Sequence, residues 1–357
     1  MKLSNESIRN KINRGQLSFI GFDQKRLHKR LERTQNIIGR PERRTLNFAL
    51  AAKNSQCLHS EDGARLDYTG RIIIPSGSLI PDDTKTTLFR KAYAYSPERI
   101  STDTELEIHE PVVFGGAMIH HFGHFLTDTL SRLWILRELP PEIRIVFLTH
   151  AGQTLDFFLK RAWIRDTLSA FGINHERIIL VDRPTIFRNI IVPQPAIEHA
   201  FRIYSAYTTS YEYAAERFET ASANGPYIYL SRSMLASDPR GCRSDEQALE
   251  QRLAANGFKI LHPETMTIAE QVSTFRSASV VAGMIGSAFH NSLFVENPNL
   301  QIIYLAEENI YERYLIIDGA KMYKSTYVNC IQSARLGSEL VRTLDVNSAC
   351  HEIFERI

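Results

Sequence analysis

Apolar and polar positions along the chain follow two different patterns. Between residues 45 and 114, short apolar runs such as RIIIP at 71–75 are interrupted by proline and glycine, which predicts short strands and turns. From residue 110 onward, apolar runs rich in β-branched residues alternate with longer stretches of helical spacing. This alternation is typical of parallel β-α-β units.

The alternation occurs as two series, each of which predicts one parallel sheet with helices between its strands. Residues 221–226 (ASANGP) separate the two series and have the small, polar composition of a domain linker. The first series predicts strands at 110–114, 143–149 and 177–182 and helices at 123–139 and 153–171. The second predicts strands at 227–233, 258–264, 279–283 and 301–306 and helices at 244–256 and 267–277.

Two Rossmann-like α/β domains in tandem are the simplest interpretation of this pattern. We expect a basic N-terminal segment at 1–44, a first Rossmann-like domain at 45–222, a second at 223–330, and a closing C-terminal helix in 331–357. Ligands of open parallel sheets bind beyond the carboxyl ends of the strands. The residues just after each strand are therefore the candidates for chemistry, and the cleft between the two sheets is the expected site.

Composition narrows the class of protein. Hydrophobic residues make up 43% of the 357 residues and charged residues 23%, which is enough to build packed cores and excludes a mainly disordered chain. The 42 Lys+Arg and 40 Asp+Glu leave a net charge of only +2, so we expect no nucleic-acid partner. The four cysteines lack the C-x-x-C spacing of zinc ribbons and redox motifs, and we interpret them as reduced thiols.

We expect neither export of this chain nor its insertion into a membrane. No run approaches the roughly 18 apolar residues of a spanning helix, and the N-terminal 25 residues contain no apolar core of a signal peptide. We therefore expect a cytoplasmic protein.

Basic residues concentrate at the N-terminus. Residues 1–44 contain twelve Lys+Arg and four Asp+Glu, a net charge of +8, whereas the rest of the chain has a net charge of −6. One interpretation is peripheral contact with an anionic membrane or acceptor, which would place the protein at the inner membrane face. The other is a solvated helical face, as in 25–33, where Leu27 and Leu31 lie four residues apart.

A first polar cluster follows the strand predicted at 110–114. His120, His124 and Asp128 are spaced by four residues, although Gly123 favours a helix that begins only near His124. An aspartate one turn from a histidine can fix its tautomer and raise its basicity, which a general base needs in order to take a proton from a sugar hydroxyl. The alternatives are a zinc site, for which no H-E-x-x-H is present, and a buried structural histidine.

A second polar cluster follows the strand predicted at 279–283. The turn Gly283 to Ala288 consists largely of small residues and leads into a predicted helix that begins with His290 and Asn291. Small residues let backbone N–H groups approach a phosphate, and a helix N-terminus favours negative charge. The turn is neither a Walker A loop nor a G-x-G-x-x-G motif, and such turns also occur without ligands.

A third cluster follows the strand predicted at 227–233. Arg232 lies at the carboxyl end of that strand, where a guanidinium can bind a phosphate with two hydrogen bonds, and Arg243 follows. Both could equally be solvated surface arginines. Glu264, after the next predicted strand, fits either a ribose contact or a turn.

Taken in order, these stretches resemble the family 61 glycosyltransferases, and a bacterial polysaccharide-type member in particular. The resemblance is carried by GHFLTDTLSRLW, then by YLSRS with Arg243 and the acidic SDEQ, and then by LHPETMTIAEQVSTFRSASVVAGMIGSAFHNSLF, over roughly residues 115–310. The chain departs from the family pattern at Ile285 to Ala288, where an H-G-A-G-like turn is common, and at Tyr304, where an acidic residue is common.

The resemblance implies a GT-B-like fold, in which two Rossmann-like domains face a central cleft, and an inverting, metal-independent glycosyltransferase. It implies a nucleotide-sugar donor, a glycan or glycolipid acceptor in capsule, lipopolysaccharide or other surface polysaccharide synthesis, and no cofactor. His124 and Asp128 then fall on the catalytic motif, with His124 as the base and Asp128 as its substitute. The residues expected to bind the donor are Arg232, Arg243, Glu264, Gly286, Ser287, Ala288, His290 and Asn291.

Two other classes of function stay open at this point. A nucleotide-dependent α/β oxidoreductase is one, although the glycine fingerprint of such enzymes is missing. The other is a non-catalytic relative that binds nucleotide or glycan. One feature of the residues favours the transferase mechanism just described: the chain contains no D-x-D, so the charge of the leaving group must be neutralised by protein groups.

Overall fold

The computed structural model describes most of the chain from residue 106 onward and short pieces before it. The described residues are 6–7, 17–31, 35–37, 43–46, 49–52, 57–59, 65–66, 72–73, 106–149, 152–181, 185–187, 189–193, 195–198, 202–218, 226–235, 243–336 and 339–357. The predicted linker lies outside them up to residue 225.

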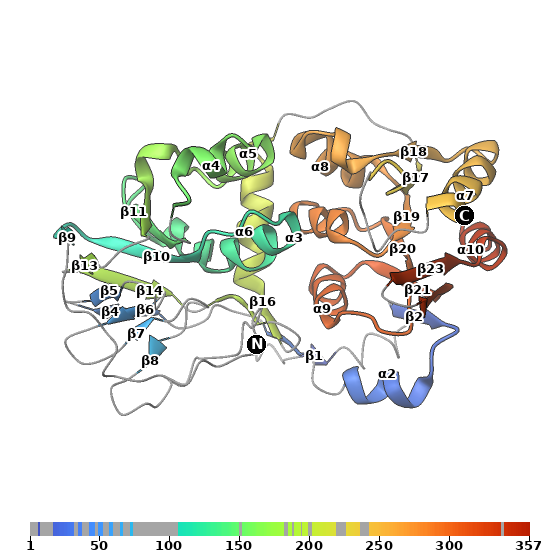
Figure 1. Ribbon diagram of the computed structural model, residues 1–357, viewed down its shortest axis with the longest axis horizontal. Coiled ribbons are helices and arrows are strands. Elements are labelled where there is room, and N and C mark those ends of the chain that lie inside the picture. Colours follow the sequence, from blue (N-terminus) through green and yellow to red (C-terminus); the bar gives the residue numbers. More distant parts are fainter. Residues whose placement is uncertain are drawn as a thin grey trace. The chain divides into compact units, whose positions relative to one another are not determined.

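The chain forms two compact units. One unit, called here the middle unit, comprises Ile38–Ala214, and the other, the flanking unit, comprises Met1–Ile37 together with Ala215–Ile357. The N-terminal 37 residues, which the sequence analysis treated as part of a separate segment, thus cluster with the C-terminal part of the chain. Both units are built on a mainly parallel sheet, as the alternating pattern predicted (Figure 1).

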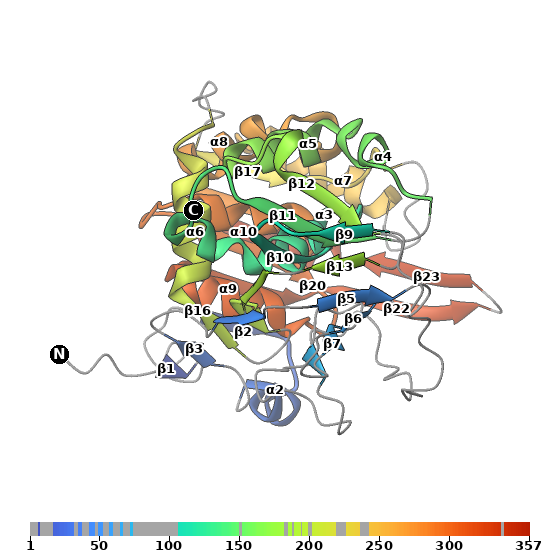
Figure 2. The ribbon, with the colours of Figure 1, turned by 90° about the vertical axis from the view of Figure 1, so that its left-hand side faces the viewer.

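The parallel sheet of the middle unit contains the three predicted strands side by side, from one edge of the sheet to its centre. Its order is β12 (Ile178–Val181), β11 (Arg144–Leu148), β10 (Val112–Ala117), β14 (Ile190–Pro193) and β4 (Arg43–Leu46). All neighbours are parallel except β14 and β4, and Figure 2 shows β10, β11 and β12 side by side. Because both faces of this sheet are covered, β10 and β11 are apolar nearly throughout.

The other elements of the middle unit are short. A second sheet runs in the order β8 (Ile72–Ile73), β7 (Arg65–Leu66), β6 (Cys57–His59), β5 (Ala49–Ala52), β13 (Thr185–Phe187) and β9 (Leu106–Ile108), and β15 (Ile197–Glu198) pairs with β16 (Arg202–Tyr204). The helices are α3 (Phe122–Thr127), the 3-10 helix η2 (Thr129–Glu138), α4 (Leu155–Leu159), α5 (Ala162–Ala170), the 3-10 turn η3 (His175–Arg177) and α6 (Ser205–Ala215).

The flanking unit contains a six-stranded sheet in which every neighbour is parallel. Its order is β18 (Lys259–Leu261), β17 (Tyr227–Leu230), β19 (Val280–Met284), β20 (Gln301–Ala306), β21 (Lys324–Asn329) and β2 (Leu17–Ile20). The edge strand β2 comes from the N-terminal segment, and its Phe19 ring stacks on Tyr327 of β21 at 5.1 Å between centroids. In the same segment α2 (Gln24–Leu31) follows, and β1 (Glu6–Ser7) pairs with β3 (Gln35–Ile37).

Helices cover both faces of the flanking sheet. The helices are α7 (Arg243–Ala255), the 3-10 turn η4 (Pro263–Thr265), α8 (Ile268–Ser277), the 3-10 helix η5 (Ser287–Phe294), α9 (Glu312–Lys321) and α10 (Val346–Phe354). Ile303 and Leu305 of β20 share one core with residues of α7 and α10. Tyr304 between them contacts Phe289 of η5 and points to the opposite face, as the alternation of a strand requires.

The end of the chain differs from the prediction of a single closing helix. β22 (Ile331–Leu336) and β23 (Glu339–Leu344) pair as antiparallel strands, and of the described residues in 331–357 only those of α10 form an α-helix. The β-branched residues of the stretch favour strands, and a helix would have had to contain Gly337. Asp345 then caps α10, with its side chain accepting from the Ser348 amide.

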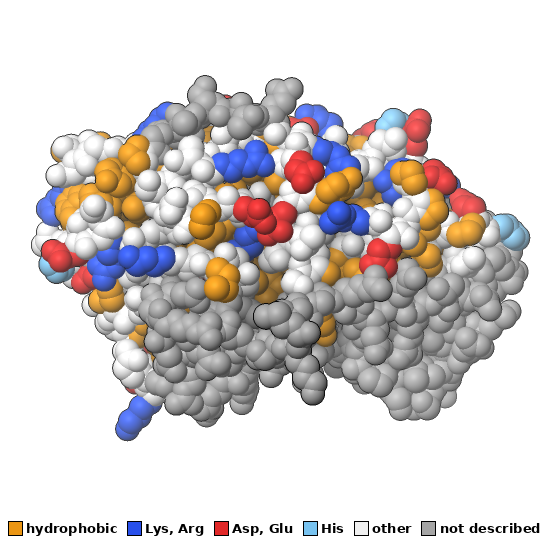
Figure 3. Space-filling model, turned by 180° about the vertical axis from the view of Figure 1, so that it is seen from behind, with side chains coloured by type: hydrophobic (Ala, Val, Ile, Leu, Met, Phe, Trp, Pro, Cys, Tyr) orange, Lys and Arg blue, Asp and Glu red, His pale blue; other side chains and the backbone are white. Residues whose placement is uncertain are grey.

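Within the part of the chain that the structure describes, no helix is long and apolar enough to cross a membrane. On the face shown in Figure 3, Lys and Arg side chains are interspersed with Asp and Glu over the described residues, in keeping with the balanced composition.

Candidate active site

The first candidate centre lies at the carboxyl end of β10, the central strand of the middle unit. Glycines end the strand where a side chain would not fit or would be strained. A Cβ at Gly115 would lie 2.5 Å from the Phe147 ring, and Gly116 has a φ of +98°. The amide of Met118 then donates to the Leu148 carbonyl at 2.9 Å, which extends the pairing with β11 by one residue. The chain enters α3 four residues later.

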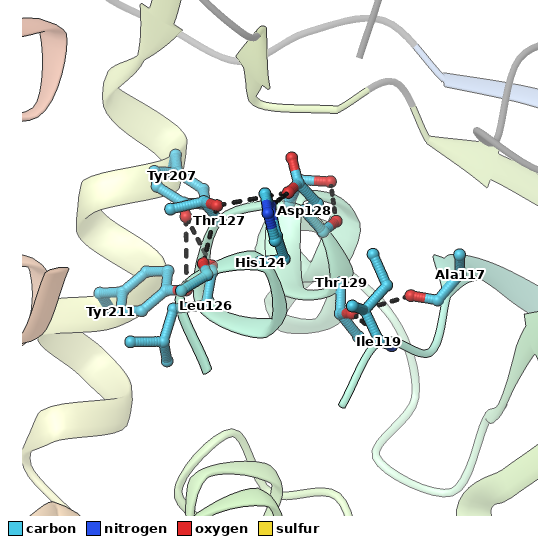
Figure 4. Close-up of polar contacts among 11 residues, drawn as sticks. Ala117, Ile119, His124, Leu126, Thr127, Asp128, Thr129, Tyr207 and Tyr211 are labelled. Atoms are coloured by element: carbon cyan, nitrogen blue, oxygen red, sulfur yellow. Dashed lines mark hydrogen bonds and ion pairs between the residues drawn. The ribbon is translucent and has the colours of Figure 1, made fainter. Parts of the chain in front are cut away.

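His124 and Asp128 meet at this edge of the sheet. His124 Nδ1 lies 2.8 Å from Asp128 Oδ2, and the Asp128 amide donates to the His124 carbonyl at 2.7 Å, so that backbone and side chains span the same turn (Figure 4). The side chains are 31% and 15% exposed, which leaves the imidazole open to a ligand while the carboxylate is largely withdrawn from water. The sequence-predicted pair is thus brought together.

The contact determines which ring nitrogen can act. An ionised carboxylate only accepts hydrogen bonds, so the neutral imidazole of His124 must carry its proton on Nδ1 to donate to Asp128. Nε2 then keeps its lone pair and is the basic atom. After Nε2 takes a proton, the Asp128 carboxylate stabilises the imidazolium.

Hydroxyl groups end α3 at Asp128, where the sequence predicted one helix over 123–139. Thr127 Oγ1 donates to the Gly123 carbonyl at 2.8 Å, and Ser131 Oγ donates to the Asp128 carbonyl at 2.6 Å. Such local bonds compete with the α-helical ladder, and the chain continues as the 3-10 helix η2. The Thr129 hydroxyl donates to the Ala117 carbonyl and accepts from the amide of Ile119, which fastens the helix to the strand end (Figure 4).

Two buried tyrosines of α6 support the same turn from the other side. The hydroxyls of Tyr207 and Tyr211 both donate to the Leu126 carbonyl, the former at 2.7 Å (Figure 4). Burial, followed by the neighbouring Tyr207 and the Asp128 charge, raises the pKa of Tyr211 well above its usual value, so that it remains a neutral donor. The sequence around His124 does not point to these tyrosines, because they lie about 80 residues away in the chain.

The other two histidines of the cluster, His120 and His121, make ring contacts. The exposed His120 ring contacts the edge of Phe157 in α4, with 5.2 Å between centroids, and His121 lies 4.8 Å from the His124 ring. Across the described part of the chain, no three His, Cys, Asp or Glu side chains are grouped so that they could hold a metal ion. Of the three residues in line, His124 and Asp128 form a polar contact with each other, whereas His120 packs against Phe157.

The second candidate centre lies at the carboxyl end of β17 in the flanking unit. Arg232 follows the strand, and its Nη1 donates to the Ile285 carbonyl at 3.4 Å. A Cβ placed on Gly286 would lie 3.0 Å from that same Nη1, so the guanidinium rests directly against the glycine. Arg232 and Gly286, which are 54 positions apart in the sequence, are therefore brought together.

Backbone amides differ between the two turns at this edge. In the turn after β17, the amide of Ser231 donates to the Leu261 carbonyl, that of Arg232 to Glu246 Oε1, and that of Ser233 to Ser231 Oγ. In the turn after β19, the first hydrogen bond of η5 runs from the Phe289 amide to the Gly286 carbonyl. The amides of Ser287 and Ala288 precede it and have no acceptor within the helix.

Glu246 is a buried carboxylate behind Arg232. Its Oε1 accepts from the Arg232 amide at 3.0 Å and from the Tyr229 hydroxyl at 3.1 Å, and the residue has no exposed surface. Burial raises its pKa to about 7, against the opposing effects of these hydrogen bonds and of the Arg232 charge. In the sequence, Glu246 is one residue of the acidic SDEQ stretch, and nothing there predicts its place behind Arg232.

His290 and Asn291, predicted to bind the donor, are buried in the packing of η5. The His290 ring stacks on Tyr314 of α9 at 4.8 Å, and Asn291 Nδ2 donates to Gln271 Oε1 of α8 at 2.7 Å. Gln271 in turn donates to the Pro263 carbonyl at 2.9 Å, which ties η4 to the same assembly. Their placement fixes the turn at Gly286 from behind.

Glu264 and Arg243 complete the set of predicted residues. Glu264 is exposed in η4, just after β18, at the same edge of the sheet as Arg232. Arg243 begins α7, and its side chain lies outside the described residues. Tyr304, where the family pattern has an acidic residue, is buried and donates to Asp318 Oδ1 at 2.9 Å.

The two centres offer different chemistry. The middle unit presents a basic imidazole nitrogen whose protonated form is stabilised by a carboxylate. The flanking unit presents a guanidinium and two helix-start amides, which are groups that bind phosphate oxygens.

Comparison with known proteins agrees with this chemistry. No curated protein matches the chain. The sequence model described as Glycosyltransferase 61 matches residues 122–303, just over half of the 357 residues, and the match runs from the start of α3 into β20. It therefore includes both candidate centres, and the chain belongs to the glycosyltransferase 61 family.

Proposed function

We propose that the protein is an inverting glycosyltransferase that moves a sugar from a nucleotide-sugar donor to a hydroxyl group of a glycan or glycolipid. The observation that carries the proposal is the 2.8 Å contact between His124 Nδ1 and Asp128 Oδ2 in a half-buried position. It leaves Nε2 as a base at the edge of the sheet where ligands of this architecture bind.

The proposed reaction is a single displacement. The acceptor oxygen attacks the anomeric carbon from the face opposite the diphosphate, and its proton passes to His124 Nε2. The bond between the anomeric carbon and the diphosphate oxygen breaks, and the diphosphate leaves with the bonding electrons. Configuration at the anomeric carbon is therefore inverted, and the imidazolium is stabilised by Asp128.

The flanking unit supplies the groups for the leaving diphosphate in this proposal. Arg232 contributes a guanidinium, and the amides of Ser287 and Ala288 contribute neutral donors at the start of η5. Gly286 gives the guanidinium its space, while His290 and Asn291 support the turn rather than touch the donor. Protein groups thus neutralise the developing charge without a metal ion, in line with the missing D-x-D motif.

Further parts of the proposal follow from family membership. A GT-B arrangement would bring the base of the middle unit and the diphosphate site of the flanking unit to one reaction. Glu264 and Arg243 would contact the donor from the turn after β18 and from the start of α7. The acceptor would belong to a surface polysaccharide pathway of a bacterial cell. Contact of the basic segment 1–44 with an anionic membrane would hold the protein at the inner face.

Donor turnover tests the proposal. Purified protein is incubated with UDP-, GDP-, dTDP- and CMP-linked sugars, and release of free nucleotide is measured for wild type and His124→Ala. We expect release from one donor class, an inverted product by proton NMR, and a large loss in the variant. His175→Ala, a change of an exposed histidine in η3, is the matched control. Wild-type rates in His124→Ala would remove the proposed base.

A further inference from the structure

The turn after β17 directs its polar backbone inward. Each amide from Ser231 to Ser233 already donates to a group of the protein, at 2.8 to 3.0 Å. A turn that binds phosphate through its backbone would instead present these N–H groups outward. Any contact of this turn with a diphosphate must therefore be made by a side chain, and Arg232 carries the only guanidinium in it.

A guanidinium at the end of a long side chain is positioned for anion binding only if the backbone of its residue is fixed. Arginine loses up to about 2 kcal/mol of side-chain entropy when it is immobilised. In this turn the Arg232 backbone is fixed by Glu246, whose Oε1 accepts a hydrogen bond from the Arg232 amide at 3.0 Å. The same oxygen accepts the Tyr229 hydroxyl from within β17, so strand and turn are held by one atom of α7.

The tip of Arg232 is confined at the other end. Its Nη1 lies 3.4 Å from the Ile285 carbonyl and against Gly286, where an added Cβ would lie 3.0 Å from it and would displace the guanidinium by a few tenths of an ångström. Glu246 and the Gly286 turn thus constrain the two ends of one side chain, from α7 and from the end of β19.

We propose that Glu246 is a positioning residue of the diphosphate site: its buried carboxylate fixes the backbone of Arg232 and so orients the guanidinium before a donor binds. This inference rests on the proposed function, in which Arg232 holds the diphosphate. A preoriented cation gains affinity because less freedom is lost on binding. Glu246 itself touches no substrate, since it has no exposed surface.

A purely structural role makes a different prediction. If Glu246 only stabilised the packing of α7 on the sheet, its loss would lower the free energy of unfolding but leave the anion affinity of the folded protein unchanged. Under the proposal, the affinity of the folded protein falls as well. Glutamine should rescue it, because its carbonyl oxygen can accept both hydrogen bonds.

The test is calorimetric titration of the full chain with inorganic pyrophosphate. We expect Arg232→Ala to weaken binding most, Glu246→Ala to weaken it by about tenfold to 100-fold, as outer-shell changes do elsewhere, and Glu246→Gln to stay near wild type. The control is Asp318→Asn, which alters a fully buried carboxylate of the same unit that accepts from Tyr304 and Tyr327. Its pyrophosphate affinity should match wild type.

The outcomes separate the positioning role of Glu246 from the proposed diphosphate site at Arg232. Wild-type affinity in Glu246→Ala, with a loss in Arg232→Ala, would overturn the positioning role and leave the diphosphate site intact. Wild-type affinity in Arg232→Ala would remove the site itself. Should Glu246→Ala fail to fold, Glu246→Asp keeps the charge but shortens the side chain by one methylene. Unchanged affinity in that variant would equally contradict the proposal, and an affinity as low for Glu246→Gln as for the alanine or aspartate variant would do so as well.

Discussion

The two candidate centres are held in place by opposite means. His124 and Asp128 belong to one helical turn, and their contact spans four residues. Arg232 is held by groups 14 and 53 positions away, in α7 and at the end of β19. A local pair can form wherever its helix turn forms, whereas the arginine is placed only when three elements of the flanking unit are assembled.

This difference implies that the centres respond differently to substitution. Changes at the local pair should alter chemistry with little effect on the rest of the middle unit. Changes around Arg232 should alter ligand affinity and, where the group is buried, stability.

The largest effect is expected for the base. His124→Ala should lower kcat by roughly 100-fold to 10,000-fold, because proton transfer by a positioned side chain contributes about that much. Asp128→Asn should reduce kcat less than this, since the ring remains but its protonated form loses the carboxylate. Steady-state nucleotide release measures both. A change confined to donor KM would contradict the assignment of His124 as base.

Arg232→Ala should come next, with a loss of about 3 to 4 kcal/mol of transition-state stabilisation, typical of one preorganised donor. Arg232→Lys should recover only part, because an ammonium cannot form the two-pronged contact of a guanidinium. Donor kcat/KM is the measured quantity. Equal activity of the lysine variant and the wild type would mean that only charge matters at this position.

Glu246 should make stability depend on pH. Its pKa is raised to about 7 in the folded protein from an ordinary 4.5, so the folded state holds the proton more tightly. Its contribution to stability is complete below about pH 4.5 and disappears as pH rises through 7. The shift corresponds to about 3 kcal/mol in total. In chemical denaturation between pH 4 and 8, Glu246→Gln should lack this decline relative to wild type, and parallel curves would contradict it.

A methyl group at Gly286 should disturb Arg232 alone. The added Cβ of Gly286→Ala would lie 3.0 Å from Arg232 Nη1, and the backbone there is extended (φ −171°), so the strain falls on the guanidinium. We expect pyrophosphate affinity to fall by about tenfold, less than for a full ångström of misplacement. Gly257→Ala, with open space around its Cβ but a φ of +85°, is the contrasting change: stability should fall and affinity should not.

The smallest effect is expected at the support of the local pair. Tyr207→Phe removes one of two hydroxyls that donate to the Leu126 carbonyl, which should cost about 1 kcal/mol of unfolding free energy. Because His124 and Asp128 contact each other directly, kcat should change little. A loss of kcat as large as that of Asp128→Asn would mean that the pair depends on α6 after all.

Sequence reasoning predicted the local features better than the long-range ones. The β-α-β alternation and the pairing of His124 with Asp128 both follow from short spacings in the sequence. The split of the helix at Asp128 was missed because it depends on hydroxyls that bond to the backbone. The closing helix predicted for 331–357 was wrong over β22 and β23, because these strands are held by their pairing with each other.

The sequence does not predict the roles of residues whose contacts are to distant parts of the chain. Glu246 gives no signal of burial, since its neighbours in the chain are polar, yet it lies behind Arg232. His290 and Asn291 carry polar groups in a promising turn but are buried between helices. Only three-dimensional packing separates a residue that faces a ligand from one that supports it.

The most direct test of the separate roles of His124 and Arg232 measures two properties on the same variants. Donor affinity and turnover are measured on the same samples of His124→Ala and Arg232→Ala, with a donor that wild type accepts. The account predicts that the histidine variant keeps its donor affinity and loses turnover, while the arginine variant loses affinity. A histidine variant that turns over at the wild-type rate, or an arginine variant that binds the donor as tightly as wild type, would contradict it.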